Sequence, residues 1–257
     1  MLELKSLQKI YNPGTVRELC LFVNFSLRVP TAQFLSIVGS NGSGKSSLLN
    51  LICGSIPLDS GQILIDQEDI TRMPEHRRLR RIGRIHQNPS MGTCARMTIL
   101  ENLSLAQNKP RQMNLMPGID RKQKERFRAM LRPLGLGLEN MLEAKAGALS
   151  GGQRQALAMV MSVMTPIDFL ILYEHTAALD PKTSDIIMEL TDKVVKEKRL
   201  TALMVTHNLR YAITYGDRLI MMHQGGIVLD RQGGEKNATG LDDVLALFTQ
   251  ISIELGN

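Results

Sequence analysis

Near the start of the chain, residues 39–46 match the pattern G-x-x-x-x-G-K-[ST]. An apolar run at residues 34–38 precedes this loop, and apolar residues at helical spacing follow it over residues 46–53. In a loop of this kind, backbone N–H groups and the helix N-terminus bind phosphate oxygens. The side chains of Lys45 and Ser46 would meet the phosphates and Mg²⁺. The sequence therefore predicts a strand, a phosphate-binding loop and a helix, in that order.

The composition is that of an ordinary globular protein and argues against several other classes. Of the 257 residues, 43% are hydrophobic and 22% are charged, which is enough apolar material for a buried core. The three cysteines are widely separated and indicate neither a disulfide framework nor a zinc site. The N-terminus does not read as a secretory signal peptide, and no apolar run approaches the length of a membrane span. We therefore expect a protein of the reducing cytosol.

Further along the chain, short apolar runs alternate with helical patterns. The runs at residues 169–172 and 202–205 are typical of parallel strands buried on both faces, and a helical stretch at residues 184–198 separates them. Between about residues 98 and 165 the pattern is mostly helical. This order predicts an α/β core with a parallel sheet and an inserted helical lobe.

Two segments of the chain are polar. The arginine-rich residues 74–84 are expected to form a solvated helical or loop face, and residues 231–240 a linker before a final amphipathic helix. Together with the net charge of +6, the arginines also raise the hypothesis of a nucleic-acid partner. No aromatic residues lie among them to stack on bases, so the solvated face is favoured.

A second glycine-containing motif, L-S-G-G-Q at residues 149–153, stands directly before the helical run at residues 156–164. It places Ser150 and two glycines at a helix N-terminus, which is a second anion-binding end. Following a phosphate loop in this order, the motif resembles the signature of the ATP-binding cassette (ABC) family. The resemblance extends over nearly the whole chain.

The resemblance implies a fold and its ligands. The fold is α/β, with a P-loop NTPase core around a parallel sheet, an antiparallel β subdomain and an inserted α-helical subdomain at about residues 88–165. The whole chain, residues 1–257, would be one nucleotide-binding domain, and its last helix would cover about residues 241–254. The ligands that the resemblance implies are ATP and Mg²⁺.

The resemblance also gives catalytic roles to single residues. Lys45 would neutralise phosphate charge, and Glu174 would orient the attacking water. Gln87 and His207 would respond to the γ-phosphate. Ser46 and Gln87 would lie nearest Mg²⁺.

Nucleotide binding would involve a larger set of residues. Tyr11 resembles the aromatic residue that stacks on adenine, although a lone aromatic beside a strand can also belong to the core. The residues implied in nucleotide binding are Tyr11, Gly39, Ser40, Asn41, Gly42, Ser43, Gly44, Lys45, Ser46, Ser47, Ser150, Gly151, Gly152, Gln153 and Asp180.

One copy of each motif suffices if two chains share the sites. In the family, the signature of a second chain closes over the nucleotide that is bound to the phosphate loop of the first. The resemblance therefore implies a homodimer at the cytoplasmic face of the cell membrane, attached to separate integral membrane permease subunits and, through them, to an extracellular solute-binding protein. No nucleic acid is expected as a partner.

Tyr173 is the most consequential departure from the family pattern, which has Asp immediately before the catalytic Glu. That Asp would bind Mg²⁺ through water, whereas a phenol with a pKa of about 10 stays neutral. Losing one such group typically costs about 10²–10³ in rate. Three interpretations stay open: a weak but working ATPase, a binding-only domain, and a one-base or engineered change. The first and third together are favoured because the other motifs are intact.

His175, where Pro is commoner, and Ser47, where Thr is commoner, are milder departures. The string at residues 174–183 resembles a bacterial subgroup of importers, some of them linked to uptake of aromatic amino acids. The sequence thus predicts the ATP-hydrolysing subunit of a bacterial importer. The alternatives are a soluble ABC ATPase linked to nucleic acids, and a nucleotide-binding domain with impaired hydrolysis.

Overall fold

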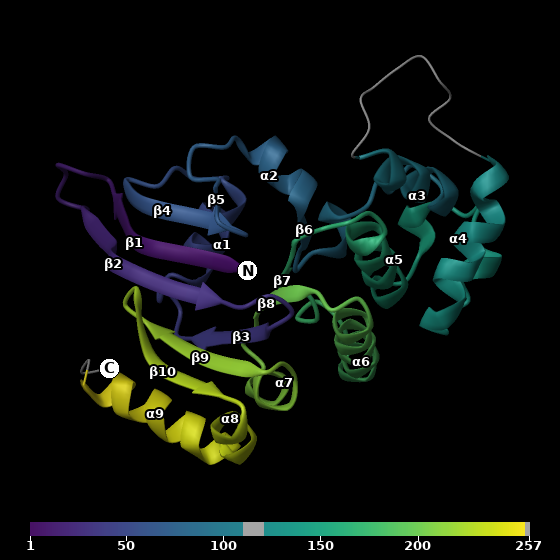
Figure 1. Cartoon of the computed structure of the whole chain (residues 1–257). Helices are drawn as coiled ribbons and strands as arrows, with labels where there is room; N and C mark the ends of the chain where they lie inside the picture. Colours follow the sequence, from purple (N-terminus) through teal and green to yellow (C-terminus); the bar gives the residue numbers. More distant parts are fainter. Residues whose placement is uncertain (110–120, 255–257) are drawn as a thin grey trace. The chain divides into compact units, whose positions relative to one another are not determined.

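The computed structural model describes residues 1–109 and 121–254 of the chain (Figure 1). Two compact units make up the chain: Met1–Leu79 together with Lys198–Asn257, and Arg80–Glu197. We call them unit 1 and unit 2. The predicted fold class is confirmed, because the strands form both parallel and antiparallel pairs and alternate with helices along the chain.

Unit 1 contains an antiparallel sheet in the order β2-β1-β4-β5. Residues of β1 such as Leu2 and Leu4 are buried while the residue after each is more exposed, as expected for a sheet with one covered face. The strands are β1 (Leu2–Tyr11), β2 (Leu19–Val29), β4 (Ser60–Ile65) and β5 (Glu68–Asp69).

The remaining strands of unit 1 form a second group around the strand that leads into the glycine loop, and this strand pairs with a strand on each side. Strand β3 (Phe34–Gly39) pairs in parallel with β8 (Thr201–Val205) and with β9 (Arg218–His223). Strand β10 (Gly226–Gln232) pairs antiparallel with β9. Every residue of β3 is buried, which explains why its sequence is mostly a continuous apolar run rather than an alternation.

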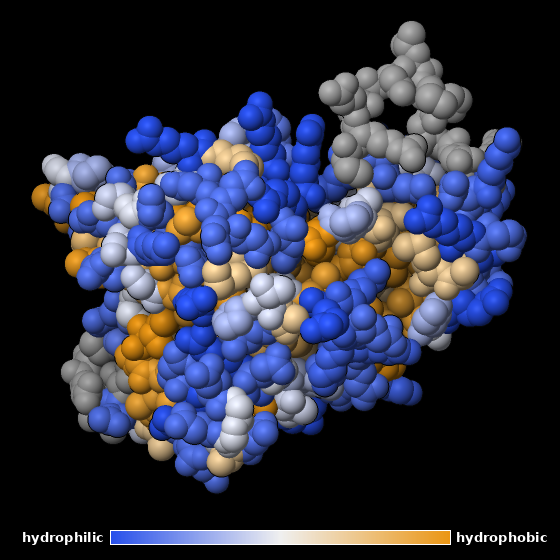
Figure 2. All heavy atoms as spheres, in the orientation of Figure 1, coloured by the Kyte–Doolittle hydropathy of each residue, from blue (hydrophilic) through white to orange (hydrophobic). Residues whose placement is uncertain are grey.

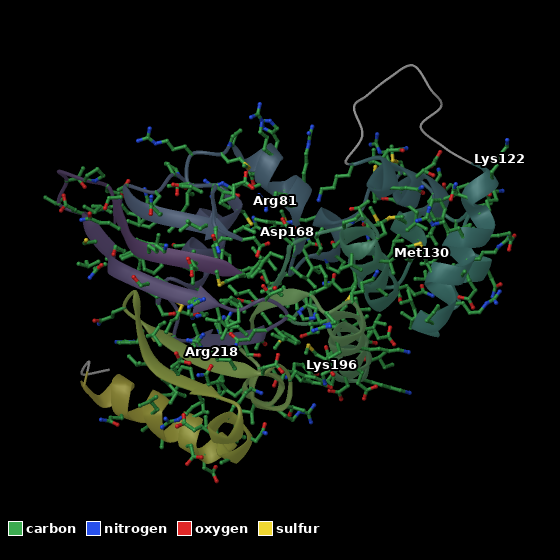
Figure 3. The ribbon with its side chains drawn as sticks, in the orientation of Figure 1. Arg81, Lys122, Met130, Asp168, Lys196 and Arg218 are labelled. Carbon is green, nitrogen blue, oxygen red and sulfur yellow. The ribbon has the colours of Figure 1, made fainter. Side chains whose placement is uncertain are left out.

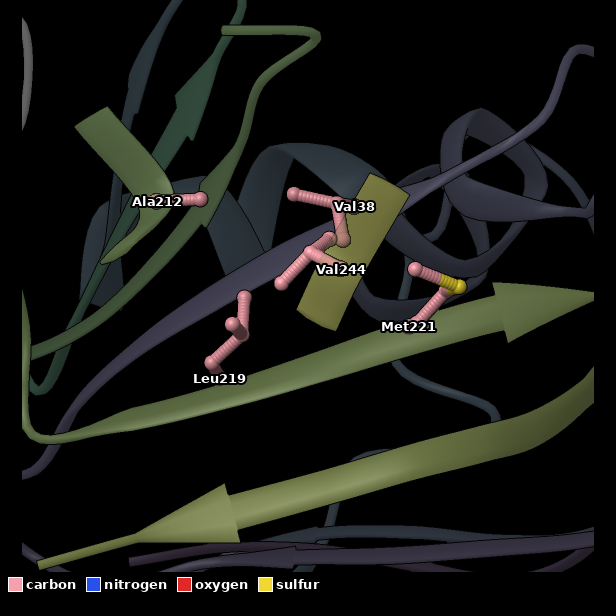
Figure 4. Packing of buried hydrophobic residues seen from close by; sticks show 5 residues of the cluster. All are labelled: Val38, Ala212, Leu219, Met221 and Val244. Carbon is pink, nitrogen blue, oxygen red and sulfur yellow. The ribbon is translucent and has the colours of Figure 1, made fainter. Parts of the chain in front are cut away.

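A small apolar cluster joins this sheet to two helices. Val38 of β3 packs with Leu219 and Met221 of β9, and with Ala212 and Val244 (Figure 4). The last two belong to α7 (Leu209–Thr214) and α9 (Leu241–Glu254). The C-terminal helix therefore packs against the strand that carries the glycine loop.

Unit 2 contains the parallel pair β6 (Ile82–Ile85) and β7 (Phe169–Tyr173). The pair is clamped at its start, because Asp168 N donates to Arg81 O at 2.8 Å and Arg81 Nε lies 2.5 Å from Asp168 Oδ2 (Figure 3). The longer helices of unit 2 are α3 (Ile99–Asn108), α4 (Lys124–Leu131), α5 (Gly151–Val163) and α6 (Pro181–Glu197).

The interpretation of residues 74–84 as a solvated helical face holds for exposed residues of the helix such as Arg77 and Arg80, and is wrong for the rest of the segment. The segment forms α2 (Glu75–Arg81) and then the strand β6, whose residues are mostly buried. Arg78 is only 5% exposed. The cation satisfies carbonyls near the end of a helix instead of facing water. Its guanidinium donates hydrogen bonds of 2.6–3.1 Å to four carbonyl groups, those of Leu51, Ile52, Thr71 and Met73.

The interpretation of residues 231–240 as a linker is also wrong. They contain the end of β10 and a short helix, α8 (Gly234–Ala238). Lys236 of this helix is buried, and its Nζ donates to Ile213 O at 2.7 Å and Tyr215 O at 3.0 Å. Lys236 thus caps the C-terminal end of α7, a long-range contact that local polarity does not reveal.

Candidate functional site

The predicted loop lies between β3 and α1 (Lys45–Cys53), and a lysine folds back across it. Lys45 Nζ donates to Gly39 O and Ser40 O, both at 2.8 Å, and lies 3.3 Å from Ser43 Oγ. The side chain is buried. Its ammonium group is therefore held against the loop backbone, where a phosphate bound by the loop N–H groups would meet its charge.

Two glycines of the loop are required by its geometry. A Cβ on Gly39, which has φ +151°, would lie 2.2 Å from Met222 O of the neighbouring strand β9. Gly44 caps the start of α1 at φ +101°, and a Cβ there would lie 3.0 Å from a ring carbon of Phe22. Each position combines a positive φ with close neighbours, so another residue would be strained.

The turn between β9 and β10 supports the loop from a distant part of the sequence. Gly225 N donates to Ser43 O at 3.1 Å, and His223 Nδ1 lies 3.4 Å from Ser40 Oγ. Gly225 has φ +75°, and a Cβ there would lie 1.6 Å from Leu21 O. Sequence reasoning missed both turn residues, although the string H-Q-G-G that contains them, between two apolar runs, is typical of a hairpin turn.

Predicted binding residues also lie at the N-terminal end of α1. The Tyr11 hydroxyl donates to Ser47 Oγ at 2.9 Å, and Lys9 Nζ lies 5.5 Å from the centre of the Tyr11 ring. Tyr11 is half-buried, and Ser46 is exposed at the first turn of the helix. The ring of Tyr11 is thus fixed beside the phosphate loop rather than packed in the core.

His207 follows β8 at the same edge of the sheet as the loop. Because β3 and β8 are parallel and Ile37 is paired with Val205, Gly39 and His207 each lie two residues beyond that pair. The chain before His207 is fixed, since Thr206 N donates to Ile37 O at 3.2 Å. His207 itself is exposed. Unit 1 therefore brings this histidine to the edge where the phosphate loop lies.

In unit 2, Gln87 and Glu174 follow the carboxyl ends of the parallel strands β6 and β7. Gln87 is exposed, and Glu174 is half-buried with φ +45°. The chain before Gln87 is tied to α5, because Gln155 Nε2 donates to His86 O at 3.2 Å. Burial and then the charge of Arg84 lower the pKa of His86, so this imidazole stays neutral at pH 7.

The signature motif forms the N-terminus of α5, as predicted from its residue types. Ser150 Oγ accepts from Gln153 N at 3.2 Å, and Gln153 Oε1 accepts from Ser150 N at 3.1 Å, which is a complete capping box. Ser150 and Gly151 are exposed. Gly152 is buried against α6, where a Cβ would lie 2.2 Å from Thr183 Cγ2. The exposed end of the helix can receive an anion from another molecule.

Asp180 caps the start of α6. Its Oδ1 accepts from Thr183 N at 3.1 Å. Hydrogen bonds from the side chain and backbone of Thr183 lower the pKa of Asp180, so the carboxylate is charged at neutral pH. Within residues 1–109 and 121–254, no group of three or more His, Cys, Asp or Glu side chains could hold a metal ion.

With this geometry in place, the chain can be compared with known proteins. The model of the family described as ABC transporter matches residues 22–177, more than half of the chain. The chain belongs to the ABC transporter family. It is an ATP-binding subunit of that family and an ATPase. The helices of the described ranges include none that is long and apolar enough to cross a membrane.

Relatives align with this ABC chain to different extents. It is 46% identical over 248 residues to the tyrosine transport ATP-binding protein of Clostridioides difficile (strain R20291), an alignment that spans 96% of this chain and 98% of that protein. It is 33% identical over 231 residues to the spermidine/putrescine import ATP-binding protein PotA of Mannheimia succiniciproducens. That alignment spans 90% of this chain but only 57% of PotA.

Solved structures of ABC cassettes share the fold. The cassette MJ1267 in its ADP conformation is 26% identical, with a TM-score of 0.80 and coverage of 100% of this chain and 99% of that one. The cassette MJ0796, in a dimeric post-hydrolysis state with ADP and Pi, is 29% identical with a TM-score of 0.74. This second alignment covers 90% of this chain and 98% of that one.

Proposed function

We propose that this chain is the ATP-hydrolysing subunit of an importer that takes up an aromatic amino acid through a separate membrane permease. One observation carries the proposal: the 46% identity, over nearly the full length of both chains, to a tyrosine transport ATP-binding protein. The string at residues 174–183 supports the same subgroup. The chain would act at the cytoplasmic face of the membrane and would work with an extracellular solute-binding protein.

The site residues would divide the chemistry among them. The loop N–H groups and Lys45 bind the β- and γ-phosphates, and Tyr11 stacks on the base. Glu174 orients the attacking water, while Gln87 and His207 respond to the γ-phosphate. The fixed position of Tyr11 beside the loop supports its role in stacking on the base. The position of His207 at the carboxyl edge of the parallel strands supports its role toward the γ-phosphate.

Mg²⁺ fits the donors that the chain offers. Ser46 presents a hydroxyl at the exposed start of α1, and Gln87 an exposed amide after β6. Magnesium keeps several waters and is usually held by few protein ligands together with substrate phosphates, so a dense carboxylate cluster is not needed. When bound, the ion would neutralise charge on the phosphates. Tyr173, however, offers no carboxylate, which weakens this part of the site.

We also propose that the working form is a homodimer in which Ser150, Gly151, Gly152 and Gln153 of one chain complete the site of the other, with Asp180 nearby. The exposed capping box supports this arrangement, because a capped but open helix N-terminus can bind a γ-phosphate that a second chain presents. The dimeric state of the cassette MJ0796 is consistent with it.

A permease contact is supported by exposed apolar side chains in the segment that follows Gln87. Met91 is 67% exposed and Met97 is 37% exposed, and Cys94 between them is also exposed. Most of the face shown in Figure 2 is hydrophilic, with smaller hydrophobic patches among the polar residues. Exposed methionines of this kind suit an adaptable contact with another protein. We propose that the helical subdomain of about residues 88–165 provides this contact.

Uptake by cells tests the proposal. The gene would be deleted, and the strain complemented with the chain or with its Lys45→Ala variant. We expect the chain, but not Lys45→Ala, to restore uptake of labelled tyrosine, tryptophan or phenylalanine, and expect spermidine uptake to be unchanged in all strains. Restored uptake with both the unmodified chain and Lys45→Ala, or with neither, would contradict the proposal. Copurification with nucleic acid rather than with a permease would favour the alternative of a nucleic-acid-linked ATPase.

A further inference from the structure

His175, directly after the proposed catalytic Glu174, is a buried histidine that no role described so far uses. It is 1% exposed, and its Nε2 lies 3.1 Å from Thr191 Oγ1 on α6. Thr191 is also fully buried, and its hydroxyl lies 2.7 Å from Ile187 O. Both contacts lie inside unit 2.

The chemistry of this chain of hydrogen bonds determines its direction. A hydroxyl has one hydrogen, which Thr191 donates to the Ile187 carbonyl, since a carbonyl can only accept. Thr191 Oγ1 must then accept from the imidazole, so His175 carries its proton on Nε2. Burial lowers the pKa of His175 to about 4, which keeps the ring neutral at physiological pH.

The backbone next to His175 needs such a support. Glu174 has φ +45°, a left-handed conformation that is unfavourable for a residue with a side chain. It persists where surrounding contacts hold it. Within the turn, Ala177 N donates to Glu174 O at 2.9 Å.

A buried face of α6 supplies further contacts. Ser184, Ile187 and Thr191 recur at the helical spacing that places them on the same face. Ser184 Oγ donates to Thr176 O at 3.0 Å, one residue beyond His175. The segment after Glu174 is therefore fastened to α6 at two points, and the one at His175 adjoins the strained residue.

We propose that His175 is a positioning residue for Glu174: its Nε2–H bond to Thr191 seats the chain on α6 and so maintains the left-handed backbone that sets the direction of the Glu174 carboxylate. This proposal rests on the proposed role of Glu174 in hydrolysis. It assigns a specific function to the histidine that stands where the family more often has proline, a residue that fixes φ by its ring and has no side-chain hydrogen bond to make.

The test compares His175→Leu, His175→Gln and Thr191→Val in the full chain carrying Tyr173→Asp, the background in which we expect the faster turnover. We expect His175→Leu and Thr191→Val to lower kcat at least tenfold while KM and the Kd for ATP change less than twofold, because a misdirected carboxylate affects the reaction more than binding. His175→Gln keeps a donor at a similar reach and should recover most of the loss. The double variant of His175→Leu and Thr191→Val should be no slower than either single one.

Val195→Ala, a buried change on α6 away from the turn, is the matched control for general loss of stability. The proposal is overturned if kcat is unchanged, if it falls only with the folded fraction, or if Val195→Ala lowers it equally. Should His175→Leu fail to fold, Thr191→Val still decides, because valine preserves the shape of the threonine side chain. If the Tyr173→Asp chain shows no turnover above its combination with Glu174→Gln, the proposed hydrolysis is overturned as well. If the Tyr173→Asp chain is active and the His175 and Thr191 variants are unaffected, only this inference is overturned.

Discussion

The phosphate loop and the turn after β7 both carry residues proposed for hydrolysis, but they are held in different ways. Much of the loop is held by itself, since Lys45 bonds to carbonyls five and six residues earlier and glycines supply its conformation, although the turn between β9 and β10 also contacts it. The turn after β7 depends on α6, through the contacts of His175 and Thr176 with residues eight to sixteen positions later. A locally determined structure can be recognised in a sequence, whereas one held by a distant helix cannot.

The largest expected effect is on the locally held loop. In the Tyr173→Asp background, Lys45→Ala should lower ATP turnover about 10³-fold, which corresponds to about 4 kcal/mol, because one preorganised charge against the transferred phosphate is lost. Steady-state hydrolysis measures it. Lys198→Ala, which removes an exposed lysine outside the loop, is the control and should leave turnover unchanged. Equal loss in both variants would show that the Lys45 position is not special.

Gly39→Ala tests whether steric crowding in the loop excludes a side chain at this position. The added Cβ would lie 2.2 Å from Met222 O at a positive φ, so we expect about 3 kcal/mol of lost unfolding free energy. Gly42→Ala is the matched control, because it shares a positive φ but has no atom within 4 Å of the Cβ position. It should cost about 1 kcal/mol. Chemical denaturation compares the two variants, and equal losses would contradict a role for crowding.

Arg78→Met tests how far the loop depends on contacts outside itself. The guanidinium satisfies carbonyls at the end of α1, the helix that the loop begins. Its removal leaves buried acceptors unsatisfied and should cost about 2–3 kcal/mol of unfolding free energy. The exposed neighbour in Arg77→Met should cost less than about 0.5 kcal/mol. A negligible effect of Arg78→Met in thermal or chemical denaturation would show that α1 needs no distant anchor.

Per pH unit, the smallest effect is a pH dependence of stability in the turn after β7. Burial holds the pKa of His175 at about 4 in the folded chain, against 6.5 when unfolded. Between these values the unfolded chain binds a proton that the folded chain does not, so stability falls as pH falls from 6.5 towards 4. The contribution is about 1.4 kcal/mol per pH unit at most.

Denaturation of the parent and of His175→Gln at several pH values measures this contribution. The variant lacks the titrating group, so its unfolding free energy should depend on pH less steeply between about pH 4.5 and 6. The difference in slope should be up to about 1.4 kcal/mol per pH unit, which is the value for one proton. The carboxylates titrate in both proteins, so their contributions to the pH dependence cancel in the comparison. Parallel pH profiles would show that His175 is not buried neutral.

The same contrast explains what the sequence could predict. The strand, loop and helix around residues 39–46 follow from glycine spacing and apolar periodicity. The capping box at Ser150 follows from its residue types. These features depend on neighbours within a few positions, so a local pattern contains them.

Other features could not be predicted because their partners are distant in sequence. The apolar pattern of β6 is interrupted by Gly83 and Arg84 and follows a run of arginines, so the segment resembles a polar surface. Arg78, Lys236 and Gly225 each have a role that depends on residues of another element. No local pattern contains those contacts.

Tyr173 lies at the end of β7, next to the turn that α6 holds, and its effect on turnover is the most direct test of the proposed hydrolysis. Mg-ATP hydrolysis would be measured at high protein concentration, because the sites are proposed to form between chains. The parent would be compared with Tyr173→Asp and with Tyr173→Asp combined with Glu174→Gln. We predict slow turnover by the parent, about 10²–10³ faster turnover by Tyr173→Asp, and loss of that gain in the double variant. Turnover by Tyr173→Asp no faster than by the double variant would contradict the assignment of Glu174 as the catalytic carboxylate.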